Sequence, residues 1–235
     1  MKEVVIKKRR NDGLSPGNIL TYEQLKKIQE GENDENLVSL DESIICSYNR
    51  FDMLPITGEK IYVRKTVADK LLYIQKILQE KNKNYFLKVL YGYRHPSIQE
   101  KYFNEMKGVL RLQHRGISEE MLNSIVHNYI AVPDVAGHPT GGAVDLTITT
   151  REGNIDMGSD SEDYTDQEKM QTFSKKISKE AQKNRILLHD LMRSIEFAPF
   201  YGEWWHFSYG DREWACFYDK EKSLYNFKDF TISKK

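Results

Sequence analysis

The sequence GHPTGGAVDLTIT occupies residues 137–149 and contains the clearest strand pattern of the chain. Val144 and every second residue up to Ile148 are apolar, which is the period of a strand with one buried face. Asp145 points to the opposite face, where a carboxylate either meets solvent or binds a partner. His138 precedes it by seven residues, across two adjacent glycines that let the backbone fold back. We therefore expect His138 and Asp145 to face the same site.

A second informative segment is GEWWHF at residues 202–207. Aromatic runs from Trp204 to Tyr209 and from Trp214 to Tyr218 flank Gly210-Asp211, which predicts a β-hairpin around that turn.

In an extended strand, His206 lies on the face opposite Trp205. If this strand pairs with residues 143–149, Asp145 and His206 point to one spot. Glu203 falls on the wrong face of an unbroken strand, so we expect it in a bend after Gly202, curling towards the site.

His138, Asp145 and His206 together supply two imidazoles and one carboxylate. Zinc bound by three protein ligands keeps a fourth position for water, as in catalytic sites. The metal lowers the pKa of that water, and Glu203 would accept its proton during attack on a carbonyl. Each motif alone occurs often by chance, and the alternative is a set of ordinary structural side chains. Their combination predicts a zinc centre with one ion per chain.

This combination resembles the metal signature of the D-alanyl-D-alanine dipeptidases, whose best-known members act in vancomycin resistance. D,D-carboxypeptidases and hedgehog-like zinc domains share the scheme. The segment from Gly92 through Arg94 to Pro96 is similar to the family's Gly-Tyr-Arg-Pro, and Asp156-Met157-Gly158 resembles a dipeptidase feature. The resemblance extends over about residues 44–218.

The resemblance implies hydrolysis of D-Ala-D-Ala or a related short dipeptide, with peptidoglycan and cell-wall recycling as its setting. Zinc-activated water would attack the peptide carbonyl, Glu203 would transfer the proton to the leaving amine, and Arg94 would stabilise the oxyanion. The expected substrate contacts are Asp163 or Glu162 at the free amino group, Tyr48 in a region loosely similar to the family's Tyr-x-x-x-Asn-Phe, and Trp205 at the pocket wall.

Two departures from the family pattern bear on the substrate. Ala136 stands where the family usually has a serine two residues before the metal histidine, which alters recognition of the terminal carboxylate. His95 intervenes between Arg94 and Pro96. One alternative is a D,D- or L,D-carboxypeptidase acting on muropeptides. Another is a non-catalytic zinc-binding domain, against which Glu203 and Arg94 both argue, because a binding module needs neither.

The chain has 235 residues with 35 basic and 35 acidic side chains, so its formal charge is zero. This balance argues against nucleic acid as a partner. Val4-Val5-Ile6 is too short for a signal peptide, and no stretch reaches the roughly 18 apolar residues of a membrane span. We expect a cytoplasmic protein, with periplasmic location or export by a signal-less route as the alternative. Nothing in the sequence specifies an oligomeric state.

The remaining patterns indicate one α+β domain with a small central antiparallel sheet flanked by helices. We expect residues 44–235 to form the catalytic domain and residues 1–43 an N-terminal extension packed on it. His114 and His127 are interpreted as solvent-facing or hydrogen-bonded rather than as ligands. The expected helices span residues 21–30, 66–81, 97–107, 118–129 and 182–196, and the expected strands span residues 85–91 and 143–149.

Overall fold

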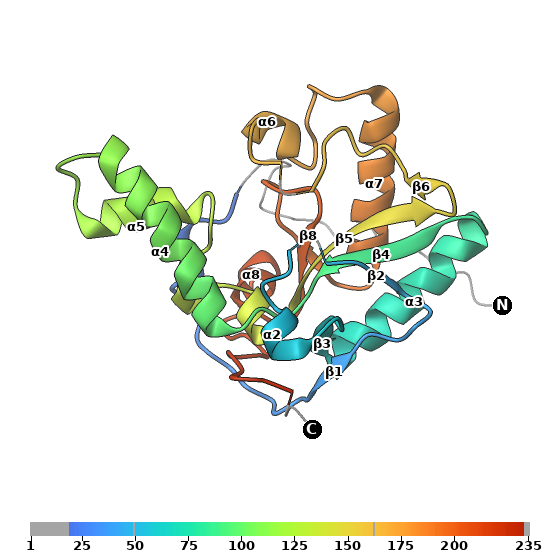
Figure 1. Ribbon diagram of the computed structural model, residues 1–235, viewed down its shortest axis with the longest axis horizontal. Coiled ribbons are helices and arrows are strands. Elements are labelled where there is room, and N and C mark those ends of the chain that lie inside the picture. Colours follow the sequence, from blue (N-terminus) through green and yellow to red (C-terminus); the bar gives the residue numbers. More distant parts are fainter. Residues whose placement is uncertain (1–18, 49, 162, 233–235) are drawn as a thin grey trace.

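The computed structural model describes residues 19–48, 50–161 and 163–232. Helices surround a mixed sheet, and two of them, α4 and α5, project as an arm from one side (Figure 1). The α+β class is therefore confirmed. The helices are α1 (Tyr22–Leu25), α2 (Leu54–Thr57), α3 (Lys65–Lys81), α4 (Pro96–Gln113), α5 (Glu119–His127), α6 (Gln167–Met170), α7 (Lys179–Ser194) and α8 (Arg212–Phe217), with short 3-10 turns η1 (Pro133–Val135) and η2 (His138–Thr140).

The main sheet has six strands, and every pairing is antiparallel except that of β2 with β4. A separate two-stranded sheet pairs β1 with β3. The strands of the main sheet run in the order β2 (Ile45–Cys46), β4 (Phe86–Tyr91), β5 (Ala143–Thr150), β8 (His206–Ser208) and β7 (Ala198–Pro199), with β6 (Gly153–Asn154) also pairing with β5, while β1 (Leu37–Ser39) and β3 (Tyr62–Arg64) form the small sheet.

Strand β5 lies at the centre of the main sheet, between β4 and β8, and its residues alternate between the two faces as the sequence predicts. Val144, Leu146 and Ile148 are fully buried in the largest apolar cluster of the described residues. Helices α3 and α7 contribute side chains to the same cluster and contact each other, so both cover this face. Asp145 and Thr147 therefore point to the other face, where the candidate site lies.

A second apolar cluster joins α1, α4, α5 and α8. Thr21 forms a capping box with Gln24, but α1 ends at Leu25, well before the expected end at residue 30. Helix α5 begins after its N-cap, Ser118, close to the expected start at residue 118, and ends at His127, two residues before the expected end. Helix α4 continues to residue 113, beyond the expected end at residue 107.

The predicted hairpin around Gly210-Asp211 is wrong. Strand β8 forms as expected, but residues 212–217 form helix α8 instead of a return strand. Asp211 is its N-cap and accepts a hydrogen bond from the Trp214 backbone nitrogen at 2.9 Å, which starts a helix directly after the turn. The aromatic side chains of this segment are buried in the apolar cluster that also includes residues of α1, α4, α5 and β7.

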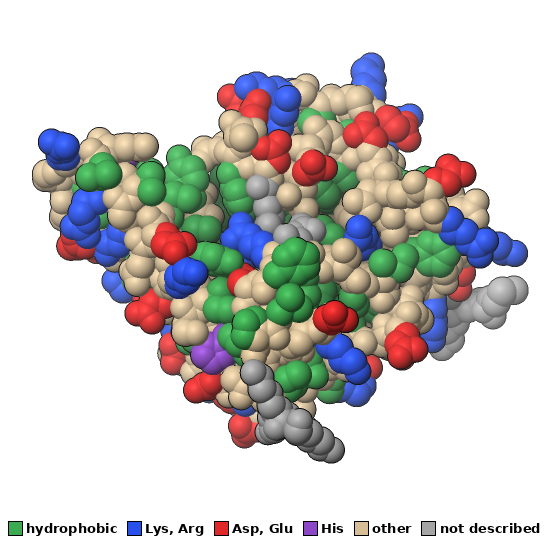
Figure 2. Space-filling model, viewed as in Figure 1, with side chains coloured by type: hydrophobic (Ala, Val, Ile, Leu, Met, Phe, Trp, Pro, Cys, Tyr) green, Lys and Arg blue, Asp and Glu red, His purple; other side chains and the backbone are tan. Residues whose placement is uncertain are grey.

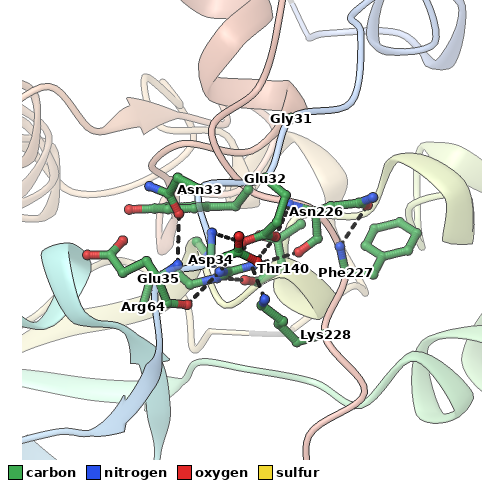
Figure 3. Close-up of polar contacts among 12 residues, drawn as sticks. Gly31, Glu32, Asn33, Asp34, Glu35, Arg64, Thr140, Asn226, Phe227 and Lys228 are labelled. Atoms are coloured by element: carbon green, nitrogen blue, oxygen red, sulfur yellow. Dashed lines mark hydrogen bonds and ion pairs between the residues drawn. The ribbon is translucent and has the colours of Figure 1, made fainter.

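Arg64, at the end of β3, joins three distant segments around its buried guanidinium (Figure 3). Its Nη1 and Nη2 donate to the two carboxylate oxygens of Glu32 at 2.8 and 2.9 Å. Nη2 also donates to the carbonyl of Asn226 at 2.8 Å, and Nε donates to the carbonyl of Thr140 at 2.6 Å. The N-terminal segment and the C-terminal tail therefore meet beside the loop that carries His138.

Acidic and basic side chains are interspersed over the face seen in Figure 2, and no single sign of charge dominates it. None of the helices in the described ranges combines the length and apolar character needed to cross a bilayer.

Candidate metal centre and active-site cavity

His138, Asp145 and His206 come together at one buried point. Asp145 lies directly opposite His206 in the pairing of β5 with β8. His138 begins the short turn η2, and Gly141, with φ of 74°, reverses the chain between that turn and β5. His138 Nε2 lies 3.3 Å from Asp145 Oδ2, and His206 Nδ1 lies 2.9 Å from Asp145 Oδ1. The three candidate ligand atoms lie within 4.8 Å of one another.

Both imidazoles are held by their other ring nitrogen. His138 Nδ1 lies 2.8 Å from the carbonyl of Gly92, which can only accept, so Nδ1 carries the proton and Nε2 is left with its lone pair. His206 Nε2 lies 3.1 Å from a carboxylate oxygen of Glu213. Two oriented imidazole nitrogens and one carboxylate are a donor set that fits zinc. The group can hold a metal ion.

The pKa values of the three side chains are shifted in different directions from their ordinary values. Burial lowers the pKa of His138, which favours the neutral form that binds metal. For Asp145, burial opposes ionisation, but the charge and hydrogen bonding of His138 and His206 hold its pKa well below the ordinary value. For His206, burial disfavours the charged form, yet Glu213 and Asp145 raise its pKa well above the ordinary value. Asp145 is therefore a carboxylate at neutral pH.

Glu203 lies in the bend before β8, as expected. Its backbone nitrogen donates to the carbonyl of Phe200 at 3.1 Å, and its own carbonyl accepts from the His206 nitrogen at 3.2 Å. These bonds fix Glu203 next to the ligand strand.

Arg94 follows the end of β4 and is 7% exposed. Its backbone nitrogen donates to the carbonyl of His138 at 3.2 Å, and Nη1 donates to Gln99 Oε1 at 2.9 Å. The guanidinium carbon lies 4.6 Å from the centre of the Tyr91 ring. Its buried Nε has no hydrogen-bond acceptor among the described residues. Arg94 therefore has a side-chain N–H that is available to a ligand, next to the candidate metal ligands.

The three candidate ligands, Glu203 and Arg94 all line one cavity. The structure thus brings together the five residues that the sequence selected. The same cavity is also lined by Arg50, Gln99, His127, Ala136, Tyr164 and Glu213.

The predicted substrate contacts lie elsewhere. Trp205 is fully buried in the main core, because strand alternation turns it away from the His206 face. The hydroxyl of Tyr48 donates to the carbonyl of Lys60 at 3.0 Å, and its side chain does not line the cavity. Asp163 lines a separate hollow and accepts hydrogen bonds from Thr165. Glu162 lies outside the described residues.

Three cavity residues were missed by sequence reasoning. His127, interpreted as solvent-facing or hydrogen-bonded, is 6% exposed and accepts a hydrogen bond from the Val132 nitrogen at 3.2 Å. Glu213 was missed because residues 212–217 were predicted to form a return strand, whereas they form α8. Arg50 stands within the Tyr48-Asn49-Arg50-Phe51 segment compared with the family, and its charge beside that motif was the available signal.

A model of the D-ala-D-ala dipeptidase family matches residues 55–227. The chain belongs to this family. The resemblance inferred from the sequence is thereby confirmed. The family match begins at residue 55, and the expected boundary after residue 43 stays a prediction.

Two relatives named D-alanyl-D-alanine dipeptidase match parts of the chain. The protein from Synechocystis sp. is 34% identical over 93 residues, which cover 35% of this chain and 38% of that protein. The protein from Escherichia coli (strain K12) is 36% identical over 73 residues, which cover 31% of this chain and 37% of that protein. The match therefore spans well under half the length of either relative.

Two solved structures resemble this family member at low sequence identity. The LdcB LD-carboxypeptidase aligns with a TM-score of 0.46 and 20% identity, over 80% of this chain and 76% of that chain. The vancomycin resistance D,D-pentapeptidase VanY, solved in complex with Zn(II), aligns with a TM-score of 0.41 and 17% identity. The alignment covers 81% of this chain and 88% of that chain.

Proposed function

We propose that this chain is a zinc-dependent peptidase that hydrolyses D-Ala-D-Ala or a related short dipeptide. One observation carries the proposal: a His, Asp, His ligand group shares a single cavity with a glutamate and a buried arginine. A purely structural metal site would need neither of the last two residues. Membership of the D-ala-D-ala dipeptidase family supports this choice of substrate.

His138 Nε2, Asp145 and His206 Nδ1 would hold one zinc ion per chain. When bound, zinc supplies a Lewis acid that polarises a carbonyl and makes water more acidic. The buried carboxylate of Asp145 would balance part of the charge of the metal, His138 presents a neutral Nε2, and His206 would bind through a deprotonated Nδ1.

Glu203 is proposed as the general base and acid. Its backbone is anchored on both sides, to Phe200 and to His206, so its side chain stays at the cavity wall. A carboxylate placed there accepts a proton from the attacking water and donates it to the nitrogen of the peptide bond. The nitrogen then leaves as a neutral amine and not as an unstable anion.

Arg94 is proposed to stabilise the oxyanion. The carbonyl oxygen of the substrate gains negative charge as water adds, and a guanidinium in a buried site interacts strongly with that charge. The Nε of Arg94 has no acceptor among the described residues, and such an acceptor would be supplied by the substrate. The hydrogen bond from the Arg94 backbone nitrogen to the His138 carbonyl holds Arg94 close to the proposed metal ligands.

Arg50 is proposed to bind the terminal carboxylate of the substrate. Ala136 lines the cavity and offers no hydroxyl for this task. The Arg50 guanidinium lies 4.9 Å from the centre of the Tyr102 ring, and Arg94 approaches the same ring at 5.5 Å. Two guanidiniums near one cavity repel each other, and an anionic ligand between them relieves that repulsion.

The test is hydrolysis by zinc-loaded protein of D-Ala-D-Ala, of L-Ala-L-Ala and of a longer peptide ending in D-Ala-D-Ala. Glu203→Gln removes the proposed base with little change in shape, and Glu168→Gln, on α6 and outside the cavity lining, is the matched control. Cleavage of the free D,D-dipeptide, lost in Glu203→Gln but kept in Glu168→Gln, is expected. No cleavage of any peptide by protein that holds zinc would refute the proposal.

A second candidate is a carboxypeptidase that trims longer peptides. The observation that favours it is the position of Asp163, outside the cavity where it was expected to neutralise a free amino group. Among the described lining residues, Asp145, Glu203 and Glu213 are the acids, and each already has a role or a histidine partner. Preference for the longer peptide in the same assay would select this candidate.

A further inference from the structure

His206 is held between two carboxylates that approach its opposite ring nitrogens. Asp145 lies 2.9 Å from Nδ1, and Glu213 lies 3.1 Å from Nε2. Asp145 belongs to the candidate ligand group, whereas Glu213 does not. Glu213 comes from α8, seven residues after His206, and reaches back over β8.

The contact with Glu213 occupies Nε2 of His206 and leaves Nδ1 facing the candidate ligand group. A neutral imidazole carries one proton, and an ionised carboxylate can only accept. With the proton on Nε2 and donated to Glu213, the lone pair of Nδ1 is directed at the ligand group. His138 has the mirror arrangement, with Nδ1 bound to the carbonyl of Gly92 and Nε2 directed inwards.

The side chain of Glu213 is only 12% exposed, and a buried carboxylate is costly unless it is paired. Besides His206, it accepts a hydrogen bond from the hydroxyl of Ser208 at 2.9 Å. Ser208 is fully buried and shares the face of β8 with His206. The carboxylate is therefore held rigidly in the position that meets Nε2.

We propose that Glu213 is a positioning residue that fixes the tautomer and ring orientation of His206 for metal binding, with Ser208 orienting Glu213. This inference rests on the proposed metal centre. Outer partners of ligating histidines raise the basicity of the ring and set its angle, and their loss weakens metal binding.

Zinc affinity, measured by competition with a chromogenic chelator, tests this role without using enzyme activity. Glu213→Leu fills the space without an acceptor, and Glu213→Gln keeps an acceptor for Nε2. Glu180→Leu, an exposed glutamate in the first turn of α7, is the control. We expect Glu213→Leu to bind zinc about 10- to 100-fold more weakly than the wild type. Glu213→Gln should lose less zinc affinity than Glu213→Leu, and the control should bind zinc as tightly as the wild type.

Cobalt substitution adds a spectroscopic measurement. The visible absorption of bound Co(II) reports ligand geometry, so we expect it to change in Glu213→Leu and to be largely restored in Glu213→Gln. Wild-type zinc affinity and an unchanged cobalt spectrum in Glu213→Leu, with circular dichroism showing an intact fold, would overturn the inference. Failure of the wild-type protein to bind zinc would instead overturn the proposed metal centre itself.

Discussion

Replacing Glu32 with alanine removes the carboxylate that pairs with Arg64, while the guanidinium stays buried. Arg64 loses two charge-assisted hydrogen bonds, at 2.8 and 2.9 Å, and its side chain is 0% exposed. Removing one partner of a buried ion pair costs about 3–5 kcal/mol of unfolding free energy. The Glu32 side chain is 26% exposed, and the carbonyls of Glu35, Thr140 and Asn226 still accept from Arg64, so we expect a loss near the lower limit, about 3 kcal/mol.

For a chain of this length, 1 kcal/mol shifts the melting temperature by about 2–4 °C. Glu32→Ala should therefore lower Tm by about 6–12 °C in thermal unfolding followed by circular dichroism. The matched control is Glu30→Ala, two residues away. Glu30 pairs with Arg212 at 2.6 Å, but its side chain is 52% exposed. An exposed pair contributes about 0–1 kcal/mol, so the control should shift Tm by less than about 4 °C. Equal shifts in the two variants would refute the role assigned to Arg64.

Three further predictions concern pH, catalysis and substrate binding. Burial opposes ionisation of Glu32, but hydrogen bonds led by that from Arg64 lower its pKa from 4.5 to about 2. The pair therefore stabilises the fold fully above about pH 4.5 and loses its effect as pH falls towards 2. In urea unfolding, the stability difference between wild type and Glu32→Ala should narrow over that range, and a constant difference would contradict the assignment. Arg94→Ala should lower kcat/KM about 10²- to 10³-fold, as measured by release of D-alanine, and a loss under tenfold would argue against oxyanion stabilisation. Arg50→Ala should raise KM for D-Ala-D-Ala with little change in kcat, and should leave KM for the dipeptide amide unchanged. Equal effects on acid and amide would contradict carboxylate binding by Arg50.

Elements with a strong local period were predicted well. The expected helix over residues 66–81 corresponds to α3, Lys65–Lys81, and the expected strand over residues 143–149 corresponds to β5, Ala143–Thr150. In both, the spacing of apolar side chains directly reports the buried face.

The failure at α8 has a physical cause. Trp214 and its aromatic neighbours have a high propensity for strands, yet their burial in the apolar cluster shared by α1, α4, α5 and β7 outweighs that propensity. The capping signal of Asp211 was present in the sequence but was interpreted as part of a turn.

The meeting of the three candidate ligands could be predicted because His138 and Asp145 stand seven residues apart and the segment with His206 was expected to pair with residues 143–149. Residues that reach the cavity through tertiary contact could not. The same holds for long-range contacts outside the cavity: the Arg64 partners Glu32 and Asn226 are 32 and 162 residues away along the chain. No short sequence pattern predicts a contact between segments so far apart.

The direct pairing of Asp145 with His206 across β5 and β8 has a consequence for how this scaffold can diverge. The two side chains are brought together by the backbone hydrogen bonds of neighbouring strands and not by the 61 residues that separate them. Loops between the strands can lengthen, shorten or exchange their chemistry without disturbing the ligand geometry. A shift of β8 by a single residue would instead present Phe207 or Trp205 to the site and abolish it at once. We therefore expect insertions to be tolerated in the connecting loops, whereas a change in the register between β5 and β8 would destroy the site.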